Sequence, residues 1–216
     1  MQVLIPYRDE NPSYSFPFFT LILIGVNVVL YYLTTISGGI DFYASRLGFR
    51  PDQILARPLI LISSIPLHAN LLHLVGNMWF LWLFGDNIED KFGRISFFIL
   101  FVLSGVAGNL THGLFSLYSS DTPVVGASGA VAGIMGAYLV RFPAAKIRCV
   151  FILIFYPIFF RIHAFWFIGA WIVWEIISVY IAPESHIAHW AHIGGFVFGL
   201  MWAFRRSDRR VLTGSL

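Results

Sequence analysis

A serine and a histidine, each beside small residues, are the two side chains of this sequence best suited to chemistry. Ser128 stands in Gly-Ala-Ser-Gly, and His192 stands 64 positions later in Ala-His-Ile-Gly-Gly. Both lie in apolar segments long enough to cross a membrane. A serine is a weak nucleophile at neutral pH and needs a base within hydrogen-bond reach, which a histidine can provide. The pair therefore suggests a serine nucleophile and its base working inside a bilayer.

Small residues recur at every fourth position beside both candidates. One stripe is Gly129, Gly133 and Ala137, and the other is Ala191, Gly195 and Gly199. Small residues at this spacing let two helix backbones approach closely. If the stripes face each other, Ser128 and His192 lie at the same depth. The alternative is that both stripes serve packing only and that Ser128 caps its helix.

Polar residues of the second apolar segment could complete such a site. His73 and Asn77 are four positions apart and therefore lie on one helix face. Both are costly in hydrocarbon, which makes them functional candidates. With the backbone N–H of Ser128 they could stabilise the oxyanion of an acyl transfer; alternatively, they only hydrogen-bond between helices. His68 is not on their face, and we expect it to fix the preceding loop.

The sequence offers His192 no carboxylate close by. Glu184, the nearest acidic residue, is eight positions away, so we expect a Ser–His dyad without a carboxylate. Glu175, inside the fifth apolar segment, is expected to contribute to substrate access or to a buried pair, or to pack as a hydrogen-bonded acid. His189 is three positions before His192, but no H-E-x-x-H motif is present, and we expect no metal.

The composition indicates an integral membrane protein. Of the 216 residues, 58% are hydrophobic and 12% are charged, and the mean hydropathy is +0.77. Soluble domains typically carry roughly 25% charged residues. The single cysteine, Cys149, excludes an intrachain disulfide. The first apolar run lacks a small-x-small cleavage site, so we expect no cleaved signal peptide. No cofactor and no nucleic-acid partner are expected.

Six apolar segments predict an all-α membrane protein with one domain over residues 1–216. The six segments are residues 18–36, 68–85, 94–115, 127–141, 164–181 and 188–204. Residues 37–67 are expected to form a loop in the membrane interface, and residues 144–163 a segment on the membrane surface. Residues 116–126 should dip toward the fourth segment and line a wet cavity, because irregular backbone at membrane depth needs polar partners.

The Lys and Arg residues set the expected orientation. With the N-terminus inside, eleven of the fourteen fall on the inner side, and Arg46, Arg50 and Arg57 fall outside. The positive-inside rule therefore predicts cytoplasmic N- and C-termini in the cell (inner) membrane, with several passes. The second, fourth and sixth segments then begin on the outer side, so that Ser128 and His192 share one half of the bilayer.

Three motifs, in order on the second, fourth and sixth segments, resemble those of the rhomboid family of intramembrane serine proteases, in its six-span bacterial and archaeal form. The motifs are His68-x4-His73-x3-Asn77, Gly126-Ala127-Ser128-Gly129 and Ala191-His192-x2-Gly195-x3-Gly199. The resemblance implies Ser128 as nucleophile, His192 as general base, and His73, Asn77 and the Ser128 backbone as oxyanion site. It also implies a six-helix bundle in lipid, with a water-filled cavity open to the outside, and transmembrane proteins as substrates.

Other positions match the family or depart from it. Glu89 and Lys91, in the turn after the second segment, match an acidic–basic turn that looks like a structural tie. Many rhomboids carry Trp-Arg in the first loop, where this chain has Leu59-Ile60. Many place an aromatic ring four residues after the serine, where it stacks on the histidine, but this chain has Ala132. Another aromatic side chain would have to orient the histidine.

The expected activity is that of a serine endopeptidase, a hydrolase that cleaves transmembrane proteins. One alternative is a catalytically silent rhomboid-like protein that binds membrane helices, and the retention of both Ser128 and His192 argues against it. A second alternative is a small transporter with histidines along its path. Clustering of the polar residues in one half of the bilayer argues against a path across it.

Overall fold

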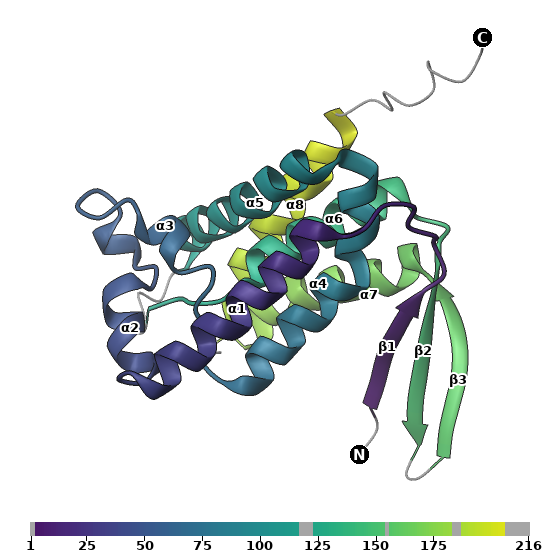
Figure 1. The fold of residues 1–216 in the computed structure, drawn as a ribbon, viewed down its shortest axis with the longest axis horizontal. Coiled ribbons are helices and arrows are strands. Elements are labelled where there is room, and N and C mark those ends of the chain that lie inside the picture. The colour runs from purple at the N-terminus through teal and green to yellow at the C-terminus, as the bar shows by residue number, and fades with distance from the viewer. Residues whose placement is uncertain (1–2, 117–122, 154–155, 183–186, 206–216) are drawn as a thin grey trace.

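The computed structural model describes residues 3–116, 123–153, 156–182 and 187–205. Most of this part is helical, and three strands form a small sheet at one end of a helix bundle (Figure 1). The expectation of an all-α protein is therefore wrong for the sheet. Glu184 and three of the eleven cations assigned to the inner side, Arg206, Arg209 and Arg210, lie outside the described residues.

A helix forms in each of the six apolar segments. These helices are α1 (Phe18–Ile36), α4 (Leu71–Phe92), α5 (Arg94–Phe115), α6 (Ser128–Arg141), α7 (Ala164–Ile181) and α8 (His189–Arg205). α4 begins at Leu71, three residues after the predicted start, so that His68 precedes it. By length and composition, α1, α5 and α7 can cross a membrane. α4 carries acidic residues in its last turns, and α6 and α8 have only 14 and 17 residues. Six membrane crossings therefore stay a prediction.

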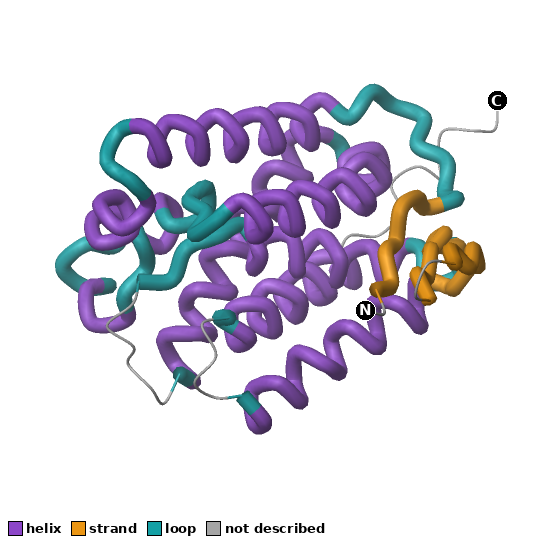
Figure 2. Tube along the Cα trace, turned by 90° about the horizontal axis from the view of Figure 1, so that it is seen from below, coloured by secondary structure: helices purple, strands orange, loops and turns teal. Residues whose placement is uncertain are grey.

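We call the end of the bundle that carries the three strands the sheet end, and the opposite end the cavity end. At the sheet end, α1, α5 and α7 begin and α4, α6 and α8 end; at the cavity end the directions are reversed. Figure 2, turned by 90° from Figure 1, shows the helices side by side and the strands at the sheet end. The starts of α4, α6 and α8, where the predicted site residues lie, therefore meet at the cavity end.

α6 is the central helix and packs closely on α8. Residues 129–138 are all buried. A methyl group on Gly195 would overlap the carbonyl oxygen of Gly129, and one on Gly199 would overlap that of Gly133. Only glycine allows two helix backbones to approach so closely. The facing stripes therefore fix how α8, with His192, lies against α6.

The sheet consists of β1 (Val3–Asp9), β2 (Lys146–Leu153) and β3 (Tyr156–His163), antiparallel and in that order. The segment expected on the membrane surface is thus a hairpin, in keeping with its β-branched and aromatic residues. The N-terminal strand joins it from far away in the sequence. At the base of the sheet, the Glu10 carboxylate lies 2.6 Å from Arg148 Nε and 3.0 Å from Arg161 Nε.

Buried polar contacts attach β1 to the helices. The Asp9 carboxylate accepts hydrogen bonds from Tyr138 Oη at 2.5 Å and from Asn87 Nδ2 at 2.9 Å. The indole N–H of Trp79 donates to the Pro6 carbonyl at 2.6 Å. Burial raises the pKa of Asp9 to about 6, although the bond from Tyr138 works in the opposite direction. The sheet is therefore anchored on α4 and α6 through a carboxyl group that titrates near neutral pH.

Glu89 also serves the sheet end, and it lies within α4. The expected turn after the second segment is wrong, because α4 continues to Phe92 and includes Glu89 and Lys91. The Glu89 carboxylate accepts from Phe19 N at 2.9 Å, from Thr20 N at 2.8 Å and from Thr20 Oγ1 at 2.9 Å. The first N–H groups of a helix have no partner within it. Glu89 supplies that partner for α1.

The chain between α1 and α4 folds over the cavity end in short helices. These are α2 (Ile40–Leu47), the 3-10 helix η1 (Pro51–Gln53) and α3 (Ile60–Ser63). Asn109 of α5 donates to the Leu61 carbonyl and to Ser64 Oγ, both at 2.9 Å. Phe49 pairs with Val124 in an isolated β-bridge. These contacts attach the long loop to α5 and to the segment before α6.

Candidate functional site

A cavity of about 1080 Å³ lies at the cavity end, where α4, α6 and α8 begin. Ser128, His192, His73 and Asn77 all line it. Residues 123–125, the end of the loop expected to reach a wet cavity, line it as well. Ser116 of that loop lines it too, and residues 117–122 lie outside the described residues. The structure therefore brings the four predicted site residues to one cavity.

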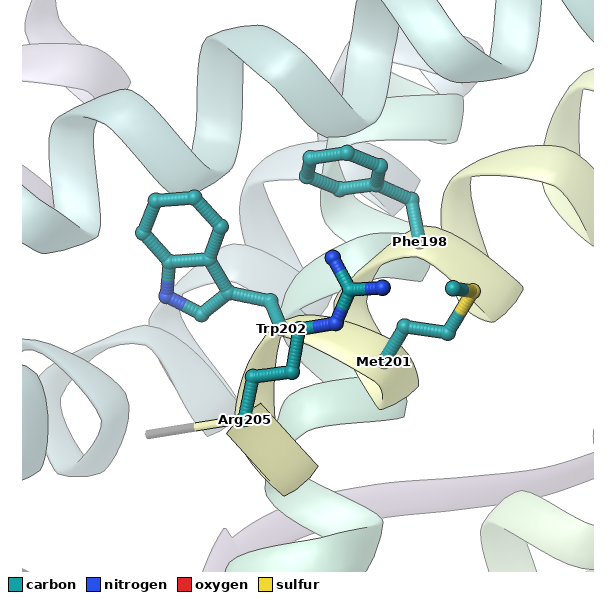
Figure 3. Close-up of a pocket in the computed structure, with 4 residues that line it drawn as sticks. All are labelled: Phe198, Met201, Trp202 and Arg205. Carbon is teal, nitrogen blue, oxygen red and sulfur yellow. The ribbon is translucent and has the colours of Figure 1, made fainter. Parts of the chain in front are cut away.

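A second cavity, of about 330 Å³, lies on α8 toward the sheet end. Figure 3 shows the side chains that line it, which are Phe198, Met201, Trp202 and Arg205. None of these four side chains is a nucleophile or a base at neutral pH, since an arginine stays protonated. The larger cavity is therefore the candidate site.

Ser128 is the first residue of α6. Ala127 occupies the N-cap position, so the Ser128 hydroxyl is not the cap of this helix. The first N–H groups of α6 have no partner within the helix and carry the positive end of its dipole. The hydroxyl therefore stands next to backbone donors at the cavity. This is the environment that an acyl transfer requires for its developing negative charge.

Gly126 brings His73 close to the segment that leads into Ser128. Its φ of +130° is a conformation that residues with a side chain rarely adopt. A Cβ at this position would lie 2.7 Å from Cε1 and 2.8 Å from Nε2 of His73. Glycine is therefore required here both for the backbone and for the space that the imidazole fills.

His192 is held by a carboxylate, contrary to the expectation of a dyad without one. Glu175 Oε2 lies 2.8 Å from Nδ1 of His192 and 2.7 Å from Nδ1 of His189. An ionised carboxylate only accepts hydrogen bonds, so both rings donate from Nδ1, and in a neutral ring Nε2 is then an acceptor. The expectation failed because Glu175 comes from another helix, 17 positions before His192. Of the alternatives considered for Glu175, the structure has the buried pair.

Trp171 supplies the aromatic contact that Ala132 cannot give. Its ring centroid lies 6.1 Å from that of His192, with an angle of 33° between the planes. Trp171 and Glu175 are four residues apart on α7 and so lie on one face of that helix. A single face of α7 therefore contacts the imidazole of His192 with both a ring and a carboxylate.

His68 takes part in the site through Asn77. The imidazole of His68 lies 3.3 Å from the Pro66 carbonyl through Nδ1 and 3.0 Å from Asn77 Nδ2 through Nε2. Donation from Nδ1 to a carbonyl leaves Nε2 as an acceptor, so the Asn77 amide donates to it. The second N–H of that amide is then available to the cavity. His68 thus fixes the loop, as expected, and also orients Asn77.

The Ser128 hydroxyl and the His192 imidazole both border the cavity. No hydrogen bond joins them among the described residues. Catalytic hydrogen bonds are often long in a free enzyme and shorten when substrate binds. The site residues therefore surround one space in which a peptide group could lie between the serine, the histidine and the donors of α4.

The fold and the cavity define a helical membrane protein with a serine and a histidine on facing helices. The rhomboid domain family matches residues 56–209, which is more than half of the chain, so the chain belongs to this family.

Three relatives come from three kingdoms of life. "Rhomboid protein 1, mitochondrial" of Saccharomyces cerevisiae is 28% identical over 195 residues, covering 84% of this chain and 51% of the yeast protein. Rhomboid protease GluP of Bacillus subtilis is 30% identical over 127 residues, covering 57% of this chain and 24% of GluP. RHOMBOID-like protein 1 of Arabidopsis thaliana is 32% identical over 144 residues, covering 67% of this chain and 33% of the Arabidopsis protein. The chain thus spans about half or less of each relative.

Proposed function

We propose that the chain is an intramembrane serine endopeptidase with Ser128 as nucleophile and His192 as general base. One observation carries the proposal. Glu175 and Trp171 hold the imidazole of His192 at a cavity that also contains Ser128 at the start of a helix. Membership of the rhomboid family and similarity to the protease GluP support the same reaction.

In the proposed reaction, Nε2 of His192 takes the proton of the Ser128 hydroxyl while Oγ attacks the peptide carbonyl carbon. The tetrahedral intermediate collapses, the C–N bond breaks, and His192 returns the proton to the leaving amine. A water molecule then attacks the acyl ester with the same histidine as base, which releases the second product and restores Ser128. The cavity at the start of α6 is the route by which water reaches the ester.

Glu175 has a positioning role in this proposal. Its bond to Nδ1–H fixes the tautomer of His192, leaves Nε2 free to accept the proton, and stabilises the imidazolium that forms. The oxyanion would accept hydrogen bonds from the Ser128 backbone N–H, the Asn77 amide and His73. Loss of one such donor typically costs about 2.7–4 kcal/mol of transition-state stabilisation.

The proposed substrates are transmembrane proteins that reach the cavity from the bilayer. A cavity at the starts of α4, α6 and α8 is buried in the outer half of the membrane if the sheet end faces the cytoplasm. That orientation follows from the cations near the sheet end, such as Lys146, Arg148 and Arg161, and from the positive-inside rule. We propose a cell-membrane location with both termini cytoplasmic.

Covalent labelling tests the proposal most directly. The purified protein in detergent should react stoichiometrically with a fluorophosphonate or isocoumarin probe, and Ser128→Ala should not react at all. Ser128→Ala and His192→Ala should each lower cleavage of a membrane substrate at least about 10⁴-fold. Asn77→Ala should have a smaller effect, because other donors remain.

Two results would contradict the proposal. Cleavage at the normal rate by Ser128→Ala would exclude Ser128 as the nucleophile. A folded protein that neither labels nor cleaves would instead be a catalytically silent rhomboid-like protein that binds membrane helices. A thermal unfolding curve for each variant separates loss of chemistry from loss of folding.

A further inference from the structure

Three side chains of α7 and α8 form a compact cluster beside the cavity. Glu175 Oε2 and the Nδ1 atoms of His189 and His192 all lie within 4.8 Å of one another. Glu175 and His189 are buried, and both histidines line the cavity. The reaction proposed above needs Glu175 and His192 but gives no task to His189. The contact of His189 with the same carboxylate oxygen is therefore not accounted for by the proposed reaction.

The cluster has the donor set of a transition-metal site. Two imidazole nitrogens and one carboxylate oxygen are ligands that Zn²⁺ accepts, with a water molecule in the fourth position. Zinc bonds of about 2.0–2.2 Å place neighbouring ligand atoms about 3.4 Å apart in a tetrahedron. The present separations from Glu175 Oε2 to the two rings are 2.7 and 2.8 Å. Small side-chain rotations would make room for an ion.

We propose that Glu175, His189 and His192 bind Zn²⁺ or a similar transition-metal ion and that the bound ion blocks proteolysis. The metal-binding part stands on the cluster alone, and the inhibitory part rests on the proposed function. The ion takes the place of the two Nδ1 protons, and each ring keeps one proton by carrying it on Nε2. The imidazole of His192 then presents an N–H to Ser128 and can no longer accept the hydroxyl proton.

The surroundings of the cluster favour reversible binding. His189 and His192 are three residues apart, so their rings project from one face of α8 toward α7. Both rings border the cavity, through which an ion and its water ligand can arrive. Nitrogen ligands favour Zn²⁺ over Mg²⁺ and Ca²⁺, which prefer oxygen. The site would therefore respond to transition metals and not to the abundant alkaline-earth ions.

Metal binding is tested on the full-length Ser128→Ala variant, in which the proposed reaction is absent and the cluster is intact. Titration with Zn²⁺ against a chromophoric chelator should show one ion per chain. Adding Glu175→Gln or His189→Ala should weaken binding at least about 10-fold, because the first replaces a charged ligand with a neutral amide and the second removes an imidazole ligand. His112→Ala is the matched control, since His112 lines the same cavity outside the cluster. Its effect should stay below about 2-fold.

Co²⁺ gives a second readout that depends on no further substitution. Bound to the Ser128→Ala protein, it should show the intense visible absorption of a four-coordinate ion, and Zn²⁺ should displace it. Absence of that absorption, or equal affinity in the His189→Ala and Glu175→Gln proteins, would overturn the metal site. Equal weakening by His112→Ala would do the same, because it would place the ion elsewhere in the cavity.

Inhibition is measured on the protein with Ser128 intact. Zn²⁺ should stop cleavage, a chelator should restore it, and the same concentration of Mg²⁺ should have no effect. Relative to its own metal-free rate, His189→Ala should need at least about 10-fold more Zn²⁺ for the same inhibition. If the same Zn²⁺ concentration inhibited the His189→Ala protein and the unsubstituted protein equally, inhibition through this cluster would be excluded. A chain that binds Zn²⁺ but cleaves nothing contradicts the proposed protease and leaves the metal site standing.

Discussion

Two buried glutamates at opposite ends of the bundle have different kinds of partners. Glu89, at the sheet end, is 1% exposed and accepts hydrogen bonds from the backbone N–H groups of Phe19 and Thr20 and from the Thr20 hydroxyl. Glu175, toward the cavity end, is 6% exposed and accepts hydrogen bonds from Nδ1 of the His189 and His192 imidazoles. One carboxylate accepts from the donors at the start of α1, and the other contacts two imidazole rings at the cavity. Both acids are buried, so it is their partners that distinguish them.

Of the substitutions that test this comparison, the one expected to have the largest effect is at Glu175. Glu175→Gln keeps the shape and an acceptor for Nδ1–H but removes the charge that stabilises the imidazolium. We expect the turnover number to fall about 100-fold or more with little change in KM, because the charge matters mainly in the transition state. Cleavage kinetics of the purified variant measure this. A variant with normal turnover would break the comparison, since both glutamates would then be structural.

Substitution of Glu89 should lower stability and leave turnover almost unchanged, in contrast to substitution of Glu175. Glu89→Gln leaves fewer and weaker acceptors for the donors at the start of α1. We expect the free energy of unfolding to fall by about 2–3 kcal/mol, because hydrogen bonds to a buried charge are lost. Unfolding in mixed micelles gives this value, and cleavage by the folded fraction should stay within about 2-fold of normal. A tenfold loss of turnover in folded protein would mean that the two ends are coupled.

The smallest effect concerns Asp9, a third acid at the sheet end that can titrate. Its pKa is raised from 3.8 to about 6, so the folded state holds its proton more tightly than the unfolded chain. This contribution to stability is complete below about pH 4 and is lost as the pH rises through about 6. Asp9→Asn should therefore flatten the pH dependence of unfolding in this range. An unchanged slope would show that another group titrates there.

The sequence predicts the lipid-facing helices best. α1, α5 and α7 begin and end where their apolar runs do, because a lipid environment selects apolar residues along the whole helix. The C-terminal end of α4 is not predicted correctly, because the polar residues around Glu89 are typical of a turn. It is helical because α1 supplies partners for its carboxylate. The pairing of the first strand is not predicted, because its partners lie more than a hundred positions away in the sequence.

The site could be predicted only in part. Spacing indicates which faces of α6 and α8 meet, since glycines at every fourth position leave one close-packing face on each. No spacing rule specifies how α7 is rotated against α8, and that rotation brings Glu175 to His192. A lone acid in an apolar helix does indicate that a partner exists. The partner's identity requires the three-dimensional arrangement.

The shortness of α6 has a consequence for how the protein enters the membrane. Its 14 residues extend about 21 Å, against roughly 30 Å for the hydrocarbon layer. Alone in lipid, its first N–H groups would have no partner at that depth. If α6 crosses the membrane as predicted, it is therefore stable there only when it packs on its neighbours α5 and α8. The insertion of the helix that carries the proposed nucleophile would then depend on those two helices.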